Sequence, residues 1–554
     1  MVYFLGLGLI ALIWQVGIWL RITRQARFYQ IEEYMSRRYL RWLFTSRARW
    51  LPQRPVVAWV AATVLTVLMS EAPGASGAFV PLIFGVLAAL VAVWPPSLGE
   101  VKKPFRATAR AKRMLGAAFA IAVVSSGFWL FALFVFRAYV ESSYAPIVIN
   151  FLWLILFLLA PFMLVAGNLL MTPVEAFLRR RFVQQAKQTL AEVHPVVIGL
   201  TGSYGKTSTK TYLAHILNGR YKAYATPKSY NTLMGICIAI NNDIANDHSI
   251  DYFIAEMGAY IPGEIERLCD LTGPSIGVEI EVGPQHLERF GSLEKTAQAK
   301  YELIKALPPD GVGVFNWDNP YVRAMYERGY PATRLGVSRE ADPAAVPAGG
   351  PRFVASEVSE TLDGLSFRVT DALTGESEAF ATTVIGQHNV TNILLATAVA
   401  VQERMTLREI GRRVRTLQPA ESRLVRQTTA EGLTIINDAY SANPAGAVSA
   451  LRVLGLHETG RRLLITPGMV ELGPLMDQEN HQLGETAARY ASDVILVGRK
   501  QTEPIQAGLL AAGFPPERLQ VVDTLAESVQ WYQNNLRSGD TVLFLNDLPD
   551  TYST

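Results

Sequence analysis

The spacing of hydrophobic residues changes near residue 195 and divides the chain into two parts. In the first part, long apolar stretches approach the roughly 20 residues that a helix needs to cross the hydrocarbon core of a bilayer. We predict that each stretch forms a transmembrane helix. The five stretches are residues 2–20, 56–69, 78–94, 114–136 and 146–170. Residues 1–185 are therefore expected to form an α-helical transmembrane region, and the connector at 171–194 to hold an amphipathic helix.

Positive charge lies in alternate connectors between these stretches. Residues 21–54 contain nine arginines, and residues 95–113 contain six lysines and arginines. The other two connectors, "SEAPGASG" and "RAYVESSYA", hold one arginine between them. Because basic loops stay on the cytoplasmic side, this alternation predicts a multi-pass protein of the cytoplasmic membrane, with its N-terminus outside and everything after residue 170 in the cytoplasm. The basic loops either only set this topology or also bind anionic lipid head groups or a lipid pyrophosphate.

From residue 195 onward, apolar runs of four to seven residues alternate with amphipathic helical patterns. This alternation is typical of parallel sheets covered by helices. We predict an α/β P-loop ATPase domain at residues 190–418, with an antiparallel meander at 353–386 where "DG" and "TGE" mark turns. A Rossmann-like α/β C-terminal domain is predicted at 419–554, with strands at "LTIIND", "RRLLITPG", "DVILVG", "LQVVD" and "DTVLFL". ATP is expected to bind between the two domains.

The run "PVVIGLTGSYGKTSTKTYLAHIL" has the pattern of a strand, a glycine-rich turn and a helix. Glycines let the backbone wrap a phosphate, the helix N-terminus offers free N–H groups, Lys206 supplies positive charge, and Thr207 can bind magnesium. The spacing G-x-x-G-K-T is shorter than the usual phosphate-loop pattern. We predict that this segment binds ATP through Gly202, Ser203, Gly205, Lys206, Thr207 and Ser208.

Three residues farther along the chain are candidates for a magnesium site. Glu256 ends a predicted strand in "YFIAEMGAY", His286 lies in "VGPQHL", and Lys300 lies in "AQAKYE". A carboxylate at a strand end supplies the oxygen ligands that magnesium prefers. Taken singly, Glu256 is equally well a solvated strand end, His286 a helix cap or loop histidine, and Lys300 a lysine on a helix face. Their joint order favours a functional role.

That order resembles the Mur ligase family, ATP-dependent amide-bond ligases of peptidoglycan synthesis, and most closely its MurF branch, which adds D-alanyl-D-alanine. The resemblance runs from about residue 195 to 547. It matches the family's phosphate loop at Lys206, its strand-end glutamate at Glu256, its magnesium-binding histidine at His286 and its carbamylated lysine at Lys300. Further matches are the family's nucleotide-contacting segments, at Asn316 in "VFNWDNP" and at His388, Asn389 and Asn392 in "GQHNVTN". In the C-terminal domain, "NDAYSANP", which contains Asp438, Tyr440, Asn443 and Pro444, and the later "PGMVELG" also match.

The resemblance implies that a substrate carboxylate attacks the γ-phosphate of ATP, and that an amine then displaces phosphate from the resulting acyl phosphate. Two magnesium ions, Lys206 and the loop N–H groups would neutralise the transferring phosphoryl group. Glu256 and His286 would place the ions, and Lys300 as a carbamate would support the second ion. Arg423, in "ESRL", would close onto the phosphates and exclude water. The implied catalytic residues are Lys206, His286, Lys300 and Arg423.

Three positions depart from the family pattern. Glu281 stands where the family usually has Asn, Ser422 stands where it usually has Gly, and "LNDLPDTY" replaces the usual lysine-glycine-serine element. The first two departures bear on metal charge balance and on domain closure. The third lies where contacts to the amino-acid substrate form, so the identity of the added amino acid or dipeptide stays open.

MurF has a soluble N-terminal domain that holds the uridine diphosphate of its substrate, and we find no such pattern before residue 196. Either the membrane part holds a lipid-linked muropeptide acceptor instead, or it is an anchor and the acceptor is soluble. The expected partners are thus a muropeptide-type acceptor, an amino acid or dipeptide, and the lipid bilayer.

Composition narrows the choice of function. A net charge of +3 is too small to indicate a nucleic-acid partner, whereas 50% hydrophobic residues among 554 fit a protein that lies partly in a membrane. Cys237 and Cys269 imply no disulfide framework.

Two other functions stay open. One is a membrane-bound Mur-like synthase of poly-amino acids such as polyglutamate, and the other is a transporter or scaffold with a regulatory ATP domain.

Overall fold

The computed structural model describes residues 2–32, 34–70, 79–95, 105–136, 144–228, 230–420, 423–439 and 443–546. Its contacts divide the chain into two units, Met1–Arg180 and Arg181–Thr554. Several positions that the sequence singles out lie outside the described residues: Ser422, Tyr440, the end of "LNDLPDTY", residues 96–104, and the connectors at 71–78 and 137–143.

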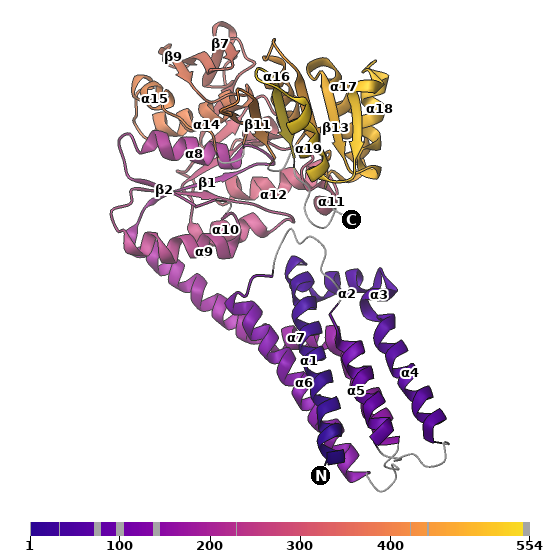
Figure 1. Cartoon of the computed structure of the whole chain (residues 1–554). Helices are drawn as coiled ribbons and strands as arrows, with labels where there is room; N and C mark the ends of the chain where they lie inside the picture. Colours follow the sequence, from indigo (N-terminus) through magenta and orange to yellow (C-terminus); the bar gives the residue numbers. More distant parts are fainter. Residues whose placement is uncertain are drawn as a thin grey trace. The chain divides into compact units, whose positions relative to one another are not determined.

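The first unit is helical (Figure 1). Its helices are α1 (Val2–Ile31), α2 (Ser36–Phe44), α3 (Arg47–Trp50), α4 (Gln53–Ser70), α5 (Phe79–Val93), α6 (Ala109–Val135) and α7 (Ala145–Val193). Each predicted apolar stretch overlaps a helix. Within the described residues, α1, α6 and α7 are long and apolar enough to cross a membrane, whereas α4 and α5 are shorter apolar helices.

Small residues let the helices of this unit approach closely. A Cβ atom at Gly167 of α7 would lie 2.8 Å from the backbone nitrogen of Ala118 in α6, so any larger residue would push the two helices apart. The indole Nε1 of Trp14 donates a hydrogen bond to Asn150 Oδ1 at 2.8 Å in the buried interior. Close contact through small residues and a satisfied interior polar pair are typical of helices that associate in lipid.

The second unit contains two sheets, of which the larger has nine strands in the order β2-β3-β1-β4-β5-β6-β7-β8-β9. Neighbours from β2 to β7 are parallel, and β7, β8 and β9 form the predicted antiparallel meander. The strands are β1 (Val196–Thr201), β2 (Ala223–Ala225), β3 (Tyr252–Glu256), β4 (Ile276–Glu279), β5 (Val312–Asn316), β6 (Thr333–Ser338), β7 (Phe353–Thr361), β8 (Gly364–Asp371) and β9 (Ser377–Thr382). We call residues 196–417, which surround this sheet, the larger lobe.

Helices cover both faces of the larger sheet. Figure 1 shows α8 and α14 on one side of the strands and α9 and α10 on the other. The C-terminal end of α7 joins the second group, because Ala186 lies in the same buried cluster as residues of α9 and α10. The helices are α8 (Lys206–Leu217), α9 (Leu233–Asn242), α10 (Glu264–Thr272), α11 (Leu287–Phe290), α12 (Leu293–Lys305), α13 (Pro320–Glu327), α14 (His388–Gln402) and α15 (Leu407–Val414).

The smaller sheet has six strands in the order β10-β11-β15-β12-β13-β14, and all neighbours except β10 and β11 are parallel. We call residues 423–546 the smaller lobe. Its strands are β10 (Val425–Thr428), β11 (Thr434–Asp438), β12 (Arg462–Thr466), β13 (Asp493–Val497), β14 (Leu519–Val522) and β15 (Thr541–Leu545). Its helices are α16 (Pro444–Gly455), α17 (Met476–Tyr490), α18 (Glu503–Ala511) and α19 (Leu525–Asn535). The five parallel strands are those that the sequence predicts.

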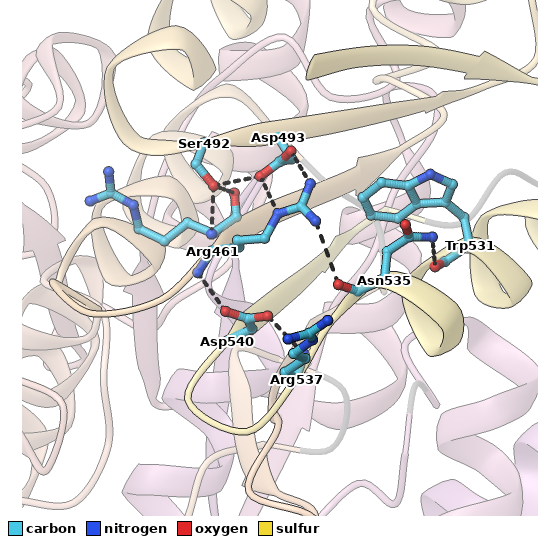
Figure 2. A network of polar contacts seen from close by, with 8 residues as sticks. Arg461, Ser492, Asp493, Trp531, Asn535, Arg537 and Asp540 are labelled. Atoms are coloured by element: carbon cyan, nitrogen blue, oxygen red, sulfur yellow. Dashed lines mark hydrogen bonds and ion pairs between the residues drawn. The ribbon is translucent and has the colours of Figure 1, made fainter. Parts of the chain in front are cut away.

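A network of charged side chains joins the amino ends of three strands in the smaller sheet (Figure 2). Arg461 donates through Nη2 to Asp493 at 2.5 Å and through its backbone nitrogen to Asp540 at 2.7 Å. Asp493 begins β13 and Asp540 precedes β15, so the network joins the amino ends of these strands. Asp438 lies at the opposite, carboxyl edge of the sheet, where β11 ends. Burial raises the pKa of Asp493, but hydrogen bonds from Arg461 and Ser492 outweigh it, and the net effect lowers the pKa.

Replacing Arg461 with Ala is expected to destabilise the smaller lobe by about 1–3 kcal/mol, because the nearly buried Asp493 loses its charged partner. Thermal unfolding of the full chain at pH 7 should show a lower midpoint. The pKa of Asp493 is depressed in the folded state, so its stabilisation is present above the ordinary carboxyl value of 3.8. The difference between variant and wild type should therefore shrink as the pH falls below about 4.

Arg499→Ala is the matched control, since Arg499 pairs with Asp523 at 3.0 Å but both side chains are more than 60% exposed. It should change stability by less than about 0.5 kcal/mol. Equal effects of the two substitutions would contradict the role assigned to the network.

Candidate active site

A cavity of about 480 Å³ lies between the larger and the smaller lobe of the second unit. The carboxyl ends of parallel strands meet at one edge of each sheet, and both edges face this cavity. Most residues that the sequence predicts for an ATP and magnesium site line it, and these are Ser203, Gly205, Lys206, Thr207, Ser208, Glu256, His286, Asn316, His388, Asn392, Arg423 and Asp438. Gly202, Lys300 and Asn389 do not belong to the lining.

The loop between β1 and α8 has the geometry of a phosphate cradle. Gly205 has a φ of 77°, and a Cβ atom there would lie 2.6 Å from Asn392 Oδ1, so the position accepts only glycine. Gly205 also caps α8 without a side-chain hydrogen bond. The first N–H groups of α8 are thus left for an anion at the helix N-terminus.

Lys206 lies over this loop. Its Nζ atom donates to the carbonyl oxygens of Gly202 at 2.5 Å and Ser203 at 3.3 Å. Burial and, to a smaller extent, the positive charge of Arg423 lower the pKa of Lys206, Glu256 opposes the shift, and the net value is about 8. A polyphosphate bound at the loop would supply a negative counter-charge and so favour the protonated form of this amine.

Glu256, at the carboxyl end of β3, is held by groups from α8. Its side chain is 2% exposed and forms an ion pair with Lys210 Nζ at 2.9 Å, and the Thr207 hydroxyl donates to it at 3.2 Å. Carboxylate and hydroxyl oxygens side by side are hard donors, so Thr207 and Glu256 fit a magnesium ion. The sequence prediction missed Lys210, although it lies one helical turn after Lys206 on the same face of α8.

Glu281, which departs from the family pattern, lies at the start of the loop after β4. The side-chain amide of Asn316 donates to its carboxylate at 3.1 Å, and that of Asn319 donates as well. Burial raises the pKa of Glu281 to about 7, and the two amide hydrogen bonds oppose that shift. Near neutral pH this side chain therefore contributes less negative charge to the cavity than a solvated glutamate would.

The motif "GQHNVTN" has two separate roles. His388 lines the cavity, and its Nδ1 atom lies 2.8 Å from the Ser449 hydroxyl of the smaller lobe. Burial, together with the positive charges of Arg339 and Arg423, lowers the pKa of His388 to about 4. Asn389 is instead a support, because its Oδ1 atom accepts a hydrogen bond from Asn392 at 3.0 Å.

Two further residues bring charge from the smaller lobe. Arg423 lies close enough to Lys206 and His388 to lower the pKa values of both. Burial raises the pKa of Asp438 to about 6, and Arg423 opposes this shift. Together with Arg339 of the larger lobe, Arg423 and Lys206 give the cavity three cationic side chains, an arrangement that suits a polyphosphate.

Lys300 lies on α12, away from the cavity lining and 4% exposed. Burial and the positive charge of Lys206 lower its pKa, Glu279 opposes the shift, and the net value is about 7. Both carboxylate oxygens of Glu279 are buried without a hydrogen-bond partner among the described residues, and burial raises the pKa of Glu279 well above its usual range.

Some of the other lining residues carry a signal in the sequence, and some do not. Asp318 and Asn319 lie two and three residues after Asn316 in "NWDNP", so the same motif could have predicted them. Asn231, Arg339 and Glu340 come from loops whose proximity to the cavity depends on the order of the strands. The lining residues that the prediction did not name include Tyr204, Asn231, Tyr260, Asp318, Asn319, Arg339 and Glu340.

Two family profiles match the second unit. The Mur ligase middle domain matches residues 200–400, and the profile described as Mur ligase, glutamate ligase domain, matches residues 422–546. Neither match includes the helical unit at 1–180.

Curated relatives named UDP-N-acetylmuramoyl-tripeptide–D-alanyl-D-alanine ligase are similar to this chain. The one from Mycobacterium leprae is 32% identical over 368 residues, which are 63% of this chain and 70% of the relative. The one from Bacillus subtilis is 28% identical over 362 residues, 65% of this chain and 75% of the relative.

Among solved structures, MurF from Thermotoga maritima in complex with ADP superposes with a TM-score of 0.57 at 22% identity, over 67% of this chain and 80% of that one. At this identity the likeness concerns the fold. The profile matches and the identity to the mycobacterial relative decide the family: the chain belongs to the Mur ligases, ATP-dependent amide ligases.

Proposed function

We propose that this protein is a membrane-bound ligase of the MurF type, which joins an amino acid or dipeptide to a muropeptide acceptor in peptidoglycan precursor synthesis. D-alanyl-D-alanine is the first dipeptide to test, because the similar relatives are named for it. The observation that carries the proposal is one cavity in which a phosphate loop, the Thr207–Glu256 pair and cations from both lobes converge.

Each residue then has a chemical task. The N–H groups at the start of α8 and the Lys206 ammonium hold the triphosphate, and Arg423 adds positive charge from the smaller lobe. Thr207 and Glu256 hold a magnesium ion, which when bound neutralises charge on the transferring phosphoryl group. With these groups in place, an acceptor carboxylate attacks the γ-phosphorus and ADP departs. An amine next attacks the acyl carbon, and phosphate leaves with one oxygen of the carboxylate.

A second ion and a carbamate on Lys300 belong to the same proposal. Carbon dioxide reacts only with a neutral amine, and a pKa near 7 leaves much of the Lys300 amine neutral at physiological pH. The raised pKa of Glu279 favours the uncharged carboxyl, so a carbamate anion next to it would meet little repulsion.

Lys206→Ala should lower acceptor-dependent ADP release at least about 100-fold, because the transferring phosphoryl group loses its nearest cation. The control is Lys222→Ala, since Lys222 is a half-exposed lysine that pairs with Asp247 and does not line the cavity. Coupled-enzyme assays of ADP release would measure both variants. Unchanged turnover in Lys206→Ala would refute the assignment.

The surface of the helical unit supports insertion into a bilayer. Large apolar side chains point outward from several of its helices and are 61–75% exposed; they include Phe4, Leu12, Leu68, Val124 and Phe131. Exposed apolar area of this extent is rare on soluble proteins. With the basic connectors inside, we place the N-terminus outside the cell and both lobes in the cytoplasm, where ATP is available.

Cysteine labelling tests this topology. A membrane-impermeant maleimide added to intact cells should label Ser76→Cys and Ser142→Cys but not Ser46→Cys, and all three positions should react after permeabilisation. Cys237 and Cys269 are buried, so background labelling should be low. If Ser46→Cys is the only one of the three to be labelled in intact cells, the topology is the opposite of the one proposed.

We propose further that the helical unit binds the acceptor through a lipid pyrophosphate. Arg21 near the end of α1 is 8% exposed and donates through Nη2 to the carbonyl of Trp50 at 3.0 Å. Its Nη1 atom is buried without a hydrogen-bond partner among the described residues, so the guanidinium retains an unused donor. Arg113 differs from Arg21, because its side chain is already paired with the Glu175 carboxylate at 2.7 Å.

A truncated protein beginning at Arg181 separates an acceptor site from an anchor. It keeps Phe182, Val183 and Ala186, which pack in the core of the second unit. If the helical unit binds the acceptor, the truncated protein should bind ATP as the full chain does but lose at least about tenfold in acceptor affinity. Full activity of the truncated protein on a nucleotide-linked muropeptide would refute the lipid-linked acceptor and leave the ligase assignment intact.

A further inference from the structure

His286 and Glu471 meet across the boundary between the two lobes. The Nδ1 atom of His286 is hydrogen-bonded to Oε2 of Glu471, and the side chains are 26% and 20% exposed. His286 caps the short helix α11 of the larger lobe, whereas Glu471 follows β12 of the smaller lobe in "PGMVELG". This contact therefore requires the two lobes to be together.

The backbone on both sides is shaped for the contact. His286 has a φ of 55° and Glu471 a φ of 63°, values that non-glycine residues rarely adopt and that recur at functional sites. Gly473, with a φ of 57°, lies so near α11 that a Cβ atom there would be 3.2 Å from the backbone nitrogen of Glu288. The segment around Glu471 is thus fitted closely to α11.

A second group fixes the imidazole ring from the larger lobe. The ring of Tyr260 packs edge-on against His286, with centroids 4.7 Å apart, and the Arg289 guanidinium lies over Tyr260 at 4.3 Å. With Tyr260 on one side and Glu471 at Nδ1, the ring has one defined orientation. His286 and Tyr260 both line the cavity.

The hydrogen bond also selects a tautomer. An ionised carboxylate can only accept, so Nδ1 of a neutral His286 carries the proton and Nε2 keeps its lone pair. Nε2 has no hydrogen-bond partner among the described residues. Histidines that ligate metals almost always donate their other ring N–H to a carboxylate or carbonyl in this way.

We infer that Glu471 is a positioning residue, which orients His286 toward the magnesium and phosphate centre and completes that centre only when the smaller lobe has closed. The inference rests on the proposed function and deepens it. Closure would then bring two contributions together, the Arg423 charge and the Glu471 carboxylate, so that the metal binds tightly only in a cavity from which water is largely excluded.

Manganese binding to the full chain in detergent, measured by electron paramagnetic resonance with a non-hydrolysable ATP analogue present, tests this inference without turnover. Glu471→Ala should weaken Mn²⁺ binding about 10–100-fold, the usual loss when a partner of a metal ligand is removed. Glu471→Gln keeps an acceptor oxygen and should recover most of the affinity. In His286→Ala, adding Glu471→Ala should cause no further loss, because the two residues act as one unit.

Glu485→Gln is the matched control, since Glu485 pairs with His481 at 3.6 Å on the exposed face of α17 in the same lobe. It should leave Mn²⁺ affinity unchanged, and thermal unfolding should confirm that every variant is folded. Unchanged Mn²⁺ affinity in Glu471→Ala, or additive losses in the double variant, would overturn the positioning role. Neither result would contradict the assignment as a ligase, because that assignment is tested by acceptor-dependent turnover and its loss in Lys206→Ala.

Discussion

The buried ion pair between Lys210 and Glu256 is the interaction on which the rest of the site depends. Both side chains are at most 4% exposed, and Lys210 Nζ also donates to the carbonyl of Lys228 at 2.6 Å. The pair thereby joins α8, the end of β3 and the loop after β2 at one point. A buried carboxylate without this partner would carry a large desolvation cost. With it, the Thr207 hydroxyl and the N-terminus of α8 are fixed next to the Glu256 carboxylate.

The second constraint is that the cavity belongs to two lobes. His388 contacts Ser449, and His286 contacts Glu471. The positive charge of Arg423 lowers the pKa of Lys206. Each contact ties a group of the larger lobe to the smaller one. Ligands that hold the lobes together should therefore also complete the charge balance of the cavity, and this coupling gives a physical reason for placing ATP at the boundary.

Local patterns in the sequence predicted the parts of this structure that are themselves local. The apolar helices, the five parallel strands of the smaller sheet and the loop at Gly205 follow from residue spacing within short windows. Strand β10 was missed because "VRQT" is short and half polar. The amphipathic helix expected after residue 170 is continuous with the preceding apolar one in α7, although Pro173 lies inside it.

Positions that depend on the order of strands were beyond a single sequence. Arg339 and Glu471 lie far from the phosphate loop in the chain. The order of the strands brings Arg339 to the cavity, and the contact between the two lobes brings Glu471 to His286. Lys300 shows the reverse case, because the sequence motif points to it while its side chain is buried and does not line the cavity.

The central claim is that phosphoryl transfer to a carboxylate takes place in the cavity between the lobes. Isotope transfer tests it most directly: an acceptor muropeptide labelled with ¹⁸O in its terminal carboxylate is incubated with the full chain, ATP, magnesium and D-alanyl-D-alanine, and the released phosphate is analysed by mass spectrometry. The account predicts one ¹⁸O atom in each phosphate formed with the amide product. Phosphate that carries oxygen only from water, with no label from the acceptor, would contradict it.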